Sequence, residues 1–172
     1  MKTRMKKLIS ISTIPVLALA LLLVLGTVLA DGAEKPAPTF TCTTEYWFVG
    51  HLGIFDAEGR LLAWEGTISG DIEGVQKCWM GPMVSTGQVG HYVYRGEIWN
   101  ADETELLLVG DEEGTTTVRH GKNSVFRANG IVTEASPEFE QWIGRQIHED
   151  GHFTWAIPGV LPDCGEGTFR IN

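Results

Sequence analysis

The chain has 172 residues, of which 43% are hydrophobic and 20% charged, and its 22 Asp and Glu residues outnumber 13 Lys and Arg residues. Four basic residues lie within residues 1–7, which leaves nine for the rest of the chain against all 22 acidic residues. Because a nucleic-acid-binding surface needs clustered positive charge for the phosphates, this composition excludes a nucleic acid as partner. The length fits one domain with a core of its own.

Residues 1–30 have the layout of an export signal: a basic start, an apolar run over residues 8–30, and the small residue Ala30 at its end. The apolar run approaches the ~20 residues that span a bilayer. Two outcomes stay open, a cleaved signal peptide or a retained N-terminal membrane anchor, and Pro15 and Gly26 favour cleavage because they interrupt the run. In both cases we expect a secreted or extracytoplasmic protein that contacts a membrane only through residues 8–30.

Residues 31–39 are predicted to be a linker, because two prolines favour an extended spacer. In residues 40–172, short β-branched and aromatic runs alternate with Gly, Asp and Asn turn signals. This rhythm predicts an all-β domain, a single antiparallel barrel of about eight to ten strands. The predicted strands are 41–49 with an extension at 51–55, 61–72, 91–99, 105–109, 115–119, 124–133, 142–148, 152–157 and 167–171.

Several segments carry turn or bend signals. The predicted turns are 56–59, 100–102, 111–114 and 150–151. The acidic turns lack the ligand spacing of an EF-hand loop, so we interpret them as solvated hairpin ends. Ser136 and Pro137 are typical of the start of a short helical turn. Gly66, Gly70 and Gly74 fall on one face of a strand, where bare backbone permits a bend or a close approach.

The chain has three cysteines, and in an oxidising compartment this odd number indicates one disulfide and one free thiol. In a closed sheet the first and last strands are neighbours, which favours the pair Cys42 and Cys164 over the pairings with Cys78. None of the three lies beside a histidine or opens a helix, so we expect no catalytic cysteine.

The segment His148-Glu149-Asp150-Gly151-His152 matches H-E-x-x-H, the zinc-protease signature. That signature requires a helix, whereas Asp150-Gly151 at its centre is a strong hairpin signal. No third ligand follows at a suitable position. We therefore interpret the two histidines as flanking a turn and expect no metal.

The orientation of the strand over residues 91–99 decides where a ligand would bind. Alternation separates Tyr92, Tyr94 and Ile98 from Val93, Arg95, Glu97 and Trp99. If the charged side points inward, it lines an aromatic small-molecule site; if the tyrosine side does, the charged pair lies on the surface. Charged residues are seldom fully buried, which favours the second arrangement. The candidate site residues are Trp64, Tyr94, Trp99 and Arg127 for ligand binding, and Glu97 and Arg95 for catalysis.

The segments Gly66-Thr67-Ile68-Ser69-Gly70, Arg127-Ala128-Asn129-Gly130-Ile131-Val132 and Gly167-Thr168-Phe169-Arg170, together with the charged hairpins, carry a resemblance to a known group. The chain resembles the β-barrels of the calycin and allene-oxide-cyclase-like group, which includes dirigent proteins. The resemblance implies a barrel and a preference for small apolar ligands in its lumen. It transfers no catalytic residue set to this sequence.

Three functions are compatible with these features. The first is a non-enzymatic exported barrel that binds a small hydrophobic or aromatic molecule in its lumen. The second is a cyclase or isomerase in which Glu97 and Arg95 move a proton or stabilise charge. The third is a cell-surface structural or protein-binding module without a pocket. The sequence favours the first and predicts no cofactor, because it has no P-loop, dinucleotide-binding or nucleophile-elbow motif.

Overall fold

The computed structural model describes residues 39–119 and 123–172. The predicted signal or anchor over residues 1–30, and the linker up to residue 38, lie outside the described residues. No described helix has the length and apolar character needed to cross a membrane. The elements are β1 (Phe40–Phe48), η1 (Gly50–Leu52), β2 (Leu61–Gly70), β3 (Gly74–Met80), β4 (Val84–Thr86), β5 (Val89–Trp99), β6 (Leu106–Arg119), β7 (Asn123–Ala135), η2 (Glu140–Trp142), β8 (Gln146–Ile157) and β9 (Leu161–Ile171).

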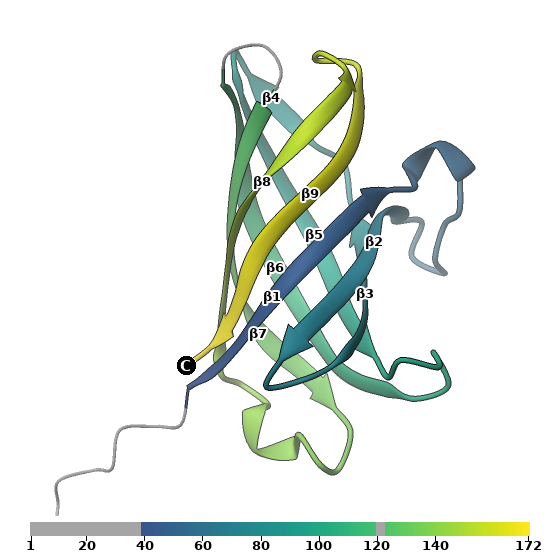
Figure 1. Ribbon diagram of the computed structural model, residues 1–172, viewed down its shortest axis with the longest axis vertical. Coiled ribbons are helices and arrows are strands. Elements are labelled where there is room, and N and C mark those ends of the chain that lie inside the picture. The colour runs from purple at the N-terminus through teal and green to yellow at the C-terminus, as the bar shows by residue number, and fades with distance from the viewer. Residues whose placement is uncertain (1–38, 120–122) are drawn as a thin grey trace, which may run out of the picture. The chain divides into compact units, whose positions relative to one another are not determined.

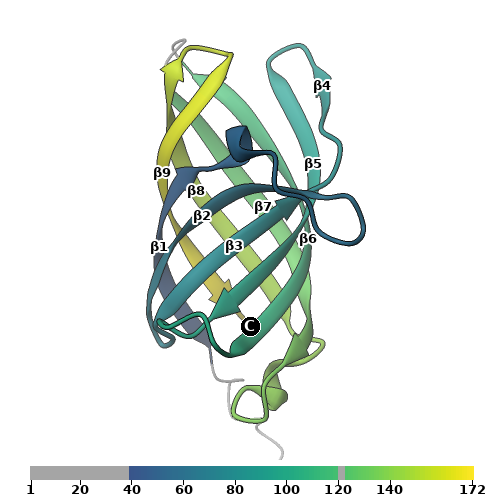
Figure 2. The same cartoon turned by 90° about the vertical axis from the view of Figure 1, so that its right-hand side faces the viewer.

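The strands form one antiparallel sheet that closes on itself. Its order is β3-β2-β1-β9-β8-β7-β6-β5-β4, and an additional pairing of β3 with β5 completes a ring of eight strands (Figures 1 and 2). The ninth strand, β4, pairs only with the first residues of β5 and stands outside the ring. The prediction of an all-β antiparallel barrel is confirmed, as is the adjacency of the first and last strands.

Two predicted turns lie inside long strands. Residues 111–114 belong to β6, and residues 150–151 belong to β8, whose neighbours pair with them without interruption. The glycines in these segments serve close contact between strands. A Cβ atom on Gly114 would lie 2.7 Å from the backbone oxygen of Arg127, and one on Gly151 would lie 2.2 Å from that of Glu166. Because both segments are extended, the acidic residues beside these glycines point alternately into the lumen and to the outer face.

The lower part of the barrel is a packed apolar core. Its buried side chains come from seven strands, from the β2–β3 connection and from the connection that contains η2: Phe40, Cys42, Ile68, Ile72, Ile98, Leu107, Leu108, Val132, Trp142, Ile147, Phe169 and Ile171. Trp142 packs edge-on against Phe40, with ring centroids 5.4 Å apart. The β7–β8 connection therefore closes this end of the barrel (Figure 1).

The predicted disulfide between Cys42 and Cys164 is absent, and all three cysteines are free. The two residues lie on paired strands but at different levels. Cys42 is opposite Phe169, whereas Cys164 is opposite Trp47, five positions further along β1 and about 16 Å away. Cys42 is also buried and Cys164 exposed, so their side chains cannot meet.

This arrangement predicts one reactive thiol in the native protein. Cys164 should react rapidly with a thiol reagent, whereas Cys42 and Cys78 should react only after denaturation, because they are buried. Absorbance titration with a disulfide reagent should count one thiol before and three after addition of guanidinium. A native count of zero, rising after reduction, would instead indicate a disulfide.

Candidate functional site

The upper part of the lumen is hollow. Above the apolar core lies a cavity of about 340 Å³ that opens at the end of the barrel opposite Trp142. Its walls are mainly aromatic and aliphatic, and its lining side chains include Tyr46, Phe48, Trp64, Cys78, Met80, Tyr92, Tyr94, Thr116, Phe126, Glu149, Phe153 and Trp155. Among the described lining residues, Glu149 is the one with an ionisable carboxyl group.

A row of aromatic rings forms one wall of this cavity. The ring of Phe153 lies 5.2 Å from that of Trp64 and 5.4 Å from that of Trp155. Trp64 in turn packs edge-on against Phe48, at 5.4 Å. The Trp155 Nε1 atom donates to the Ser124 hydroxyl at 2.9 Å, which fixes the orientation of the indole. The wall is thus preformed by contacts among its own side chains.

Glu149 lies at the floor of the cavity and is held by three hydrogen-bond donors. The hydroxyl of Tyr46 donates to Oε1, and the hydroxyl of Tyr94 donates to Oε2. The side-chain nitrogen of Gln76 also donates to Oε1, at 3.2 Å. These donors come from β1, β5 and β3, and so the ring closure of the barrel brings them to one carboxylate.

Glu112 is buried beside this group without any hydrogen-bond partner. Both of its carboxylate oxygens are buried and unpaired. Its side chain lies over inward-facing glycines: a Cβ atom on Gly96 or Gly110 would lie 3.2 or 3.4 Å from Oε1, and one on Gly130 would lie 2.5 Å from Cγ. The glycines therefore supply the space that the carboxyl group occupies.

Burial controls the charge of this layer. Desolvation raises the pKa of Glu112 well above its ordinary value, and the charge of Glu149 raises it further. Desolvation also raises the pKa of Glu149, while the hydrogen bonds from Tyr46, Tyr94 and Gln76 oppose that rise. The Tyr94 hydroxyl opposes the rise at Glu112 as well, but Glu149 has three such donors, so we assign the proton to Glu112 first. Burial likewise raises the pKa of Tyr46 and Tyr94, which keeps both hydroxyls protonated as donors.

This geometry can hold one small molecule and place a hydrogen-bonded carboxyl group against its polar end. The apolar walls lower the local dielectric, so interactions with Glu149 are stronger than they would be in solvent.

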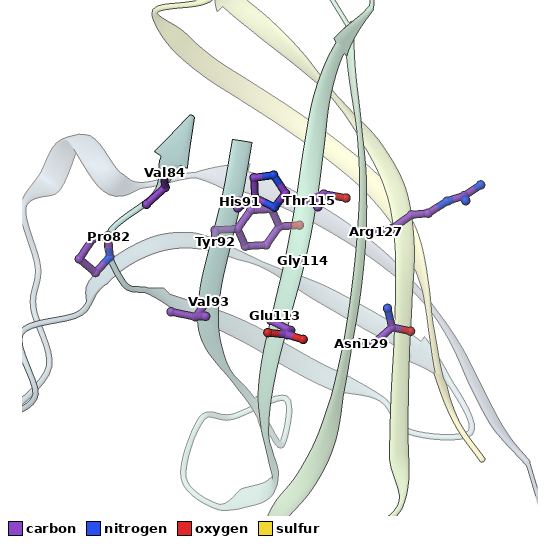
Figure 3. Close-up of a pocket in the computed structure, with 10 residues that line it drawn as sticks. All are labelled: Pro82, Val84, His91, Tyr92, Val93, Glu113, Gly114, Thr115, Arg127 and Asn129. Atoms are coloured by element: carbon purple, nitrogen blue, oxygen red, sulfur yellow. The ribbon is translucent and has the colours of Figure 1, made fainter. Parts of the chain in front are cut away.

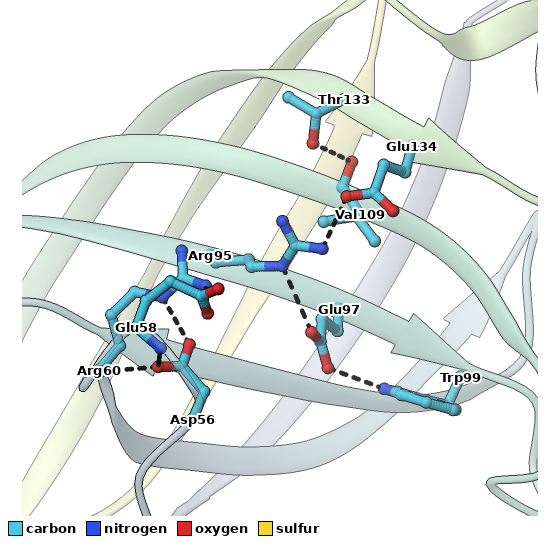
Figure 4. A network of polar contacts seen from close by, with 9 residues as sticks. All are labelled: Asp56, Glu58, Arg60, Arg95, Glu97, Trp99, Val109, Thr133 and Glu134. Carbon is cyan, nitrogen blue, oxygen red and sulfur yellow. Dashed lines mark hydrogen bonds and ion pairs between the residues drawn. The ribbon is translucent and has the colours of Figure 1, made fainter.

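The structure places the predicted site residues on opposite sides of the barrel wall. Trp64 and Tyr94 line the cavity. Trp99, Arg95 and Glu97 lie on the outer face of β5, in the arrangement that the sequence favoured. Arg95 Nε donates to Glu97 Oε1 at 3.4 Å, and Trp99 Nε1 donates to Glu97 Oε2 at 3.2 Å (Figure 4). Arg95 also pairs with Glu134 at 2.8 Å. This network is part of the outer surface and has no access to the lumen.

Arg127 also faces outward. It borders an open groove of about 570 Å³ over β4 to β7, together with Glu113, Thr115 and Asn129 (Figure 3). These side chains are exposed and carry both charge signs. We regard the groove as solvated surface, because it offers neither an enclosed apolar wall nor a buried polar group.

Sequence reasoning missed Glu112 and Glu149, because both stood in segments predicted as turns or motifs. Glu149 is the glutamate of the H-E-x-x-H match, but this segment is extended in β8. His148 and His152 face outward there, against Asn129 at 2.7 Å and Glu166 at 3.5 Å. Over residues 39–119 and 123–172, no cluster of three His, Cys, Asp or Glu side chains could hold a metal ion. The alternation of side chains along this strand could have identified Glu149. It shares one face of β8 with Ile147, Gly151 and Phe153.

No protein-family model matches this sequence, and no curated protein or solved structure is significantly similar to it. The assignment of a function therefore depends on the lumen itself.

The buried pair predicts an inverse dependence of stability on pH. A carboxyl group whose pKa is raised by folding favours the folded state below its unfolded pKa. That contribution is lost as pH rises towards the folded pKa. The free energy of unfolding should therefore decline above about pH 4.5, by about 1.4 kcal/mol per unit of pKa elevation.

Glu112→Gln should reduce this decline and make the protein more stable than the wild type at pH 8. Urea unfolding followed by tryptophan fluorescence at several pH values would measure it. The exposed neighbour Glu113 provides the control, because Glu113→Gln should leave the slope unchanged. Equal slopes in all three proteins would show that Glu112 is not the group responsible.

Proposed function

We propose that this barrel binds a small, largely apolar molecule in its lumen. The observation that carries the proposal is the aromatic cavity of about 340 Å³, which is closed at one end by the core and open at the other. This volume is at the lower end of the range for small-molecule sites, ~300–1,000 Å³, so the ligand is small. The same cavity argues against a purely structural module with a filled core.

The positions of Arg95 and Glu97 argue against the cyclase or isomerase alternative as first suggested. Arg95 and Glu97 pair with each other on the outer face and cannot reach a lumenal substrate. A proton-transfer reaction would have to use Glu149 with Tyr46 and Tyr94 at the cavity floor. Because these groups also suffice to orient a ligand, binding is the simpler proposal.

We also propose that the protein works outside the cytoplasm. The support comes from the sequence of residues 1–30, with its basic start, its apolar run and its terminal Ala30. Amino-terminal sequencing of the exported protein would distinguish cleavage after Ala30 from a retained anchor, and a protein found only in the cytoplasm would refute the proposal.

Two neighbouring threonines of β6 provide a matched test of lumenal binding. Thr116 lines the cavity, whereas Thr115 borders the outer groove. Thr116→Phe adds a ring to the cavity and should weaken binding of a neutral aromatic probe such as 4-phenylbutan-1-ol at least about tenfold, because filling removes the space for the ligand. Thr115→Phe should leave the affinity unchanged.

Tryptophan fluorescence is a suitable readout, since Trp64 and Trp155 line the cavity. Thermal melts should first establish that both variants are folded. If the probe binds equally well to the wild type and to both variants, the ligand does not occupy the lumen.

A further inference from the structure

The two buried carboxyl groups have no positively charged partner among the side chains of residues 39–117 and 123–172, which are those that the structure describes. Glu112 and Glu149 are 5% and 4% exposed. The ion pairs among these side chains all involve other carboxylates. The buried side chains of these ranges include no Lys, Arg or His. A negative charge on the pair is therefore uncompensated by these side chains, which is costly in a low-dielectric interior.

Glu149 also keeps room for one more donor. An ionised carboxyl group offers about four acceptor positions. Tyr46 and Gln76 donate to Oε1, whereas Tyr94 alone donates to Oε2. Since Glu149 lines the cavity, the fourth position is left for a group that enters through the mouth.

The walls above Glu149 are suited to a positive charge. The faces of aromatic rings, of tryptophan above all, attract ammonium groups electrostatically. Trp64, Phe153 and Trp155 line the same cavity as Glu149. A cation in the cavity would therefore lie among aromatic rings and next to a carboxylate that has no ion-pair partner.

We propose that the lumenal ligand is an organic cation, a small primary or secondary amine on an apolar body. Its ammonium group contacts Glu149 and its apolar part packs against the aromatic wall. This inference rests on the lumenal binding proposed above and names the ligand class for that site.

Other ligand classes fit less well. A carboxylate ligand would add a third acidic group next to two that are already buried together. A neutral alcohol could donate one hydrogen bond to Glu149 but would leave the charge of the pair uncompensated. An ammonium group supplies both the donor and the charge.

The surroundings of the pair are otherwise neutral or acidic. The ionisable groups that face it across the lumen are Tyr46 on β1, Cys78 on β3 and Tyr92 and Tyr94 on β5, and the adjacent outward carboxylates are Asp111 and Asp150. None of these supplies a positive charge. Protonation of Glu149 itself therefore controls amine binding, which should weaken as the pH falls.

Calorimetry with three matched probes tests this inference on the full chain. At pH 8, 4-phenylbutylamine should bind at least about tenfold more tightly than 4-phenylbutan-1-ol, and 4-phenylbutanoic acid should bind most weakly. Glu149→Gln should reduce the affinity for the amine to that for the alcohol. Glu113→Gln, on the outer face of β6, should keep the preference.

A measurement on the wild type covers the case in which Glu149→Gln fails to fold. The preference for amine over alcohol should shrink between pH 8 and pH 5, because the carboxyl group becomes protonated. Equal affinities at pH 8, with the alcohol still sensitive to Thr116→Phe, would overturn the cation inference and leave lumenal binding intact. If no probe binds in a manner sensitive to Thr116→Phe, lumenal binding itself is refuted.

Discussion

The pairing of β3 with β5 is the constraint on which the rest of this structure depends. It joins Val75–Met80 to Tyr94–Trp99 and turns an open sheet into a ring. Without it, the inward faces of the strands would line an open surface, and the two glutamates could reach water. With it, alternate side chains of the eight ring strands point into the lumen. Closure therefore creates the cavity and also buries two carboxyl groups at its floor.

The lumen is divided into levels by the sizes of its side chains. Leu108, Val132 and Ile147 are fully buried and belong to the apolar core at the lower level. At the middle level the strands contribute glycines, and the bare backbone at Gly96 and Gly130 makes room for the Glu112 side chain. Large aromatic rings at the upper level stand against one another along the wall and leave the centre open. Glycines thus surround the Glu112 side chain, and large aromatic residues surround the cavity.

The sequence predicted the architecture because the strand rhythm is a local property. Alternation over residues 91–99 also indicated the inward tyrosine face, since it left Arg95 and Glu97 outside. The disulfide prediction failed for a different reason. Strand adjacency could be inferred from closure, but the register that separates Cys42 from Cys164 depends on pairing along the whole ladder.

Sequence analysis missed Glu112 and Glu149 because a glycine next to an acidic residue has two structural interpretations. An acidic residue next to glycine predicts a hairpin turn, and Glu113-Gly114 and Asp150-Gly151 both have that form. Glycine in a strand interior, however, also marks a close approach of neighbouring backbones. Local sequence cannot separate these cases, because the atoms that would clash with a Cβ on Gly114 or Gly151 belong to other strands.

The cost of burying Glu112 and Glu149 links the fold to the proposed function. An acid without a partner in a dry interior lowers stability, and an apolar side chain in place of Glu112 would avoid that cost. Glu149, by contrast, is oriented by three donors from three different strands, an arrangement that favours its charged form in an otherwise apolar chamber. Neither feature is needed to close the barrel, since the apolar core below holds the strands together. The organic cation that we propose as the ligand would supply the charge that this positioned carboxylate lacks.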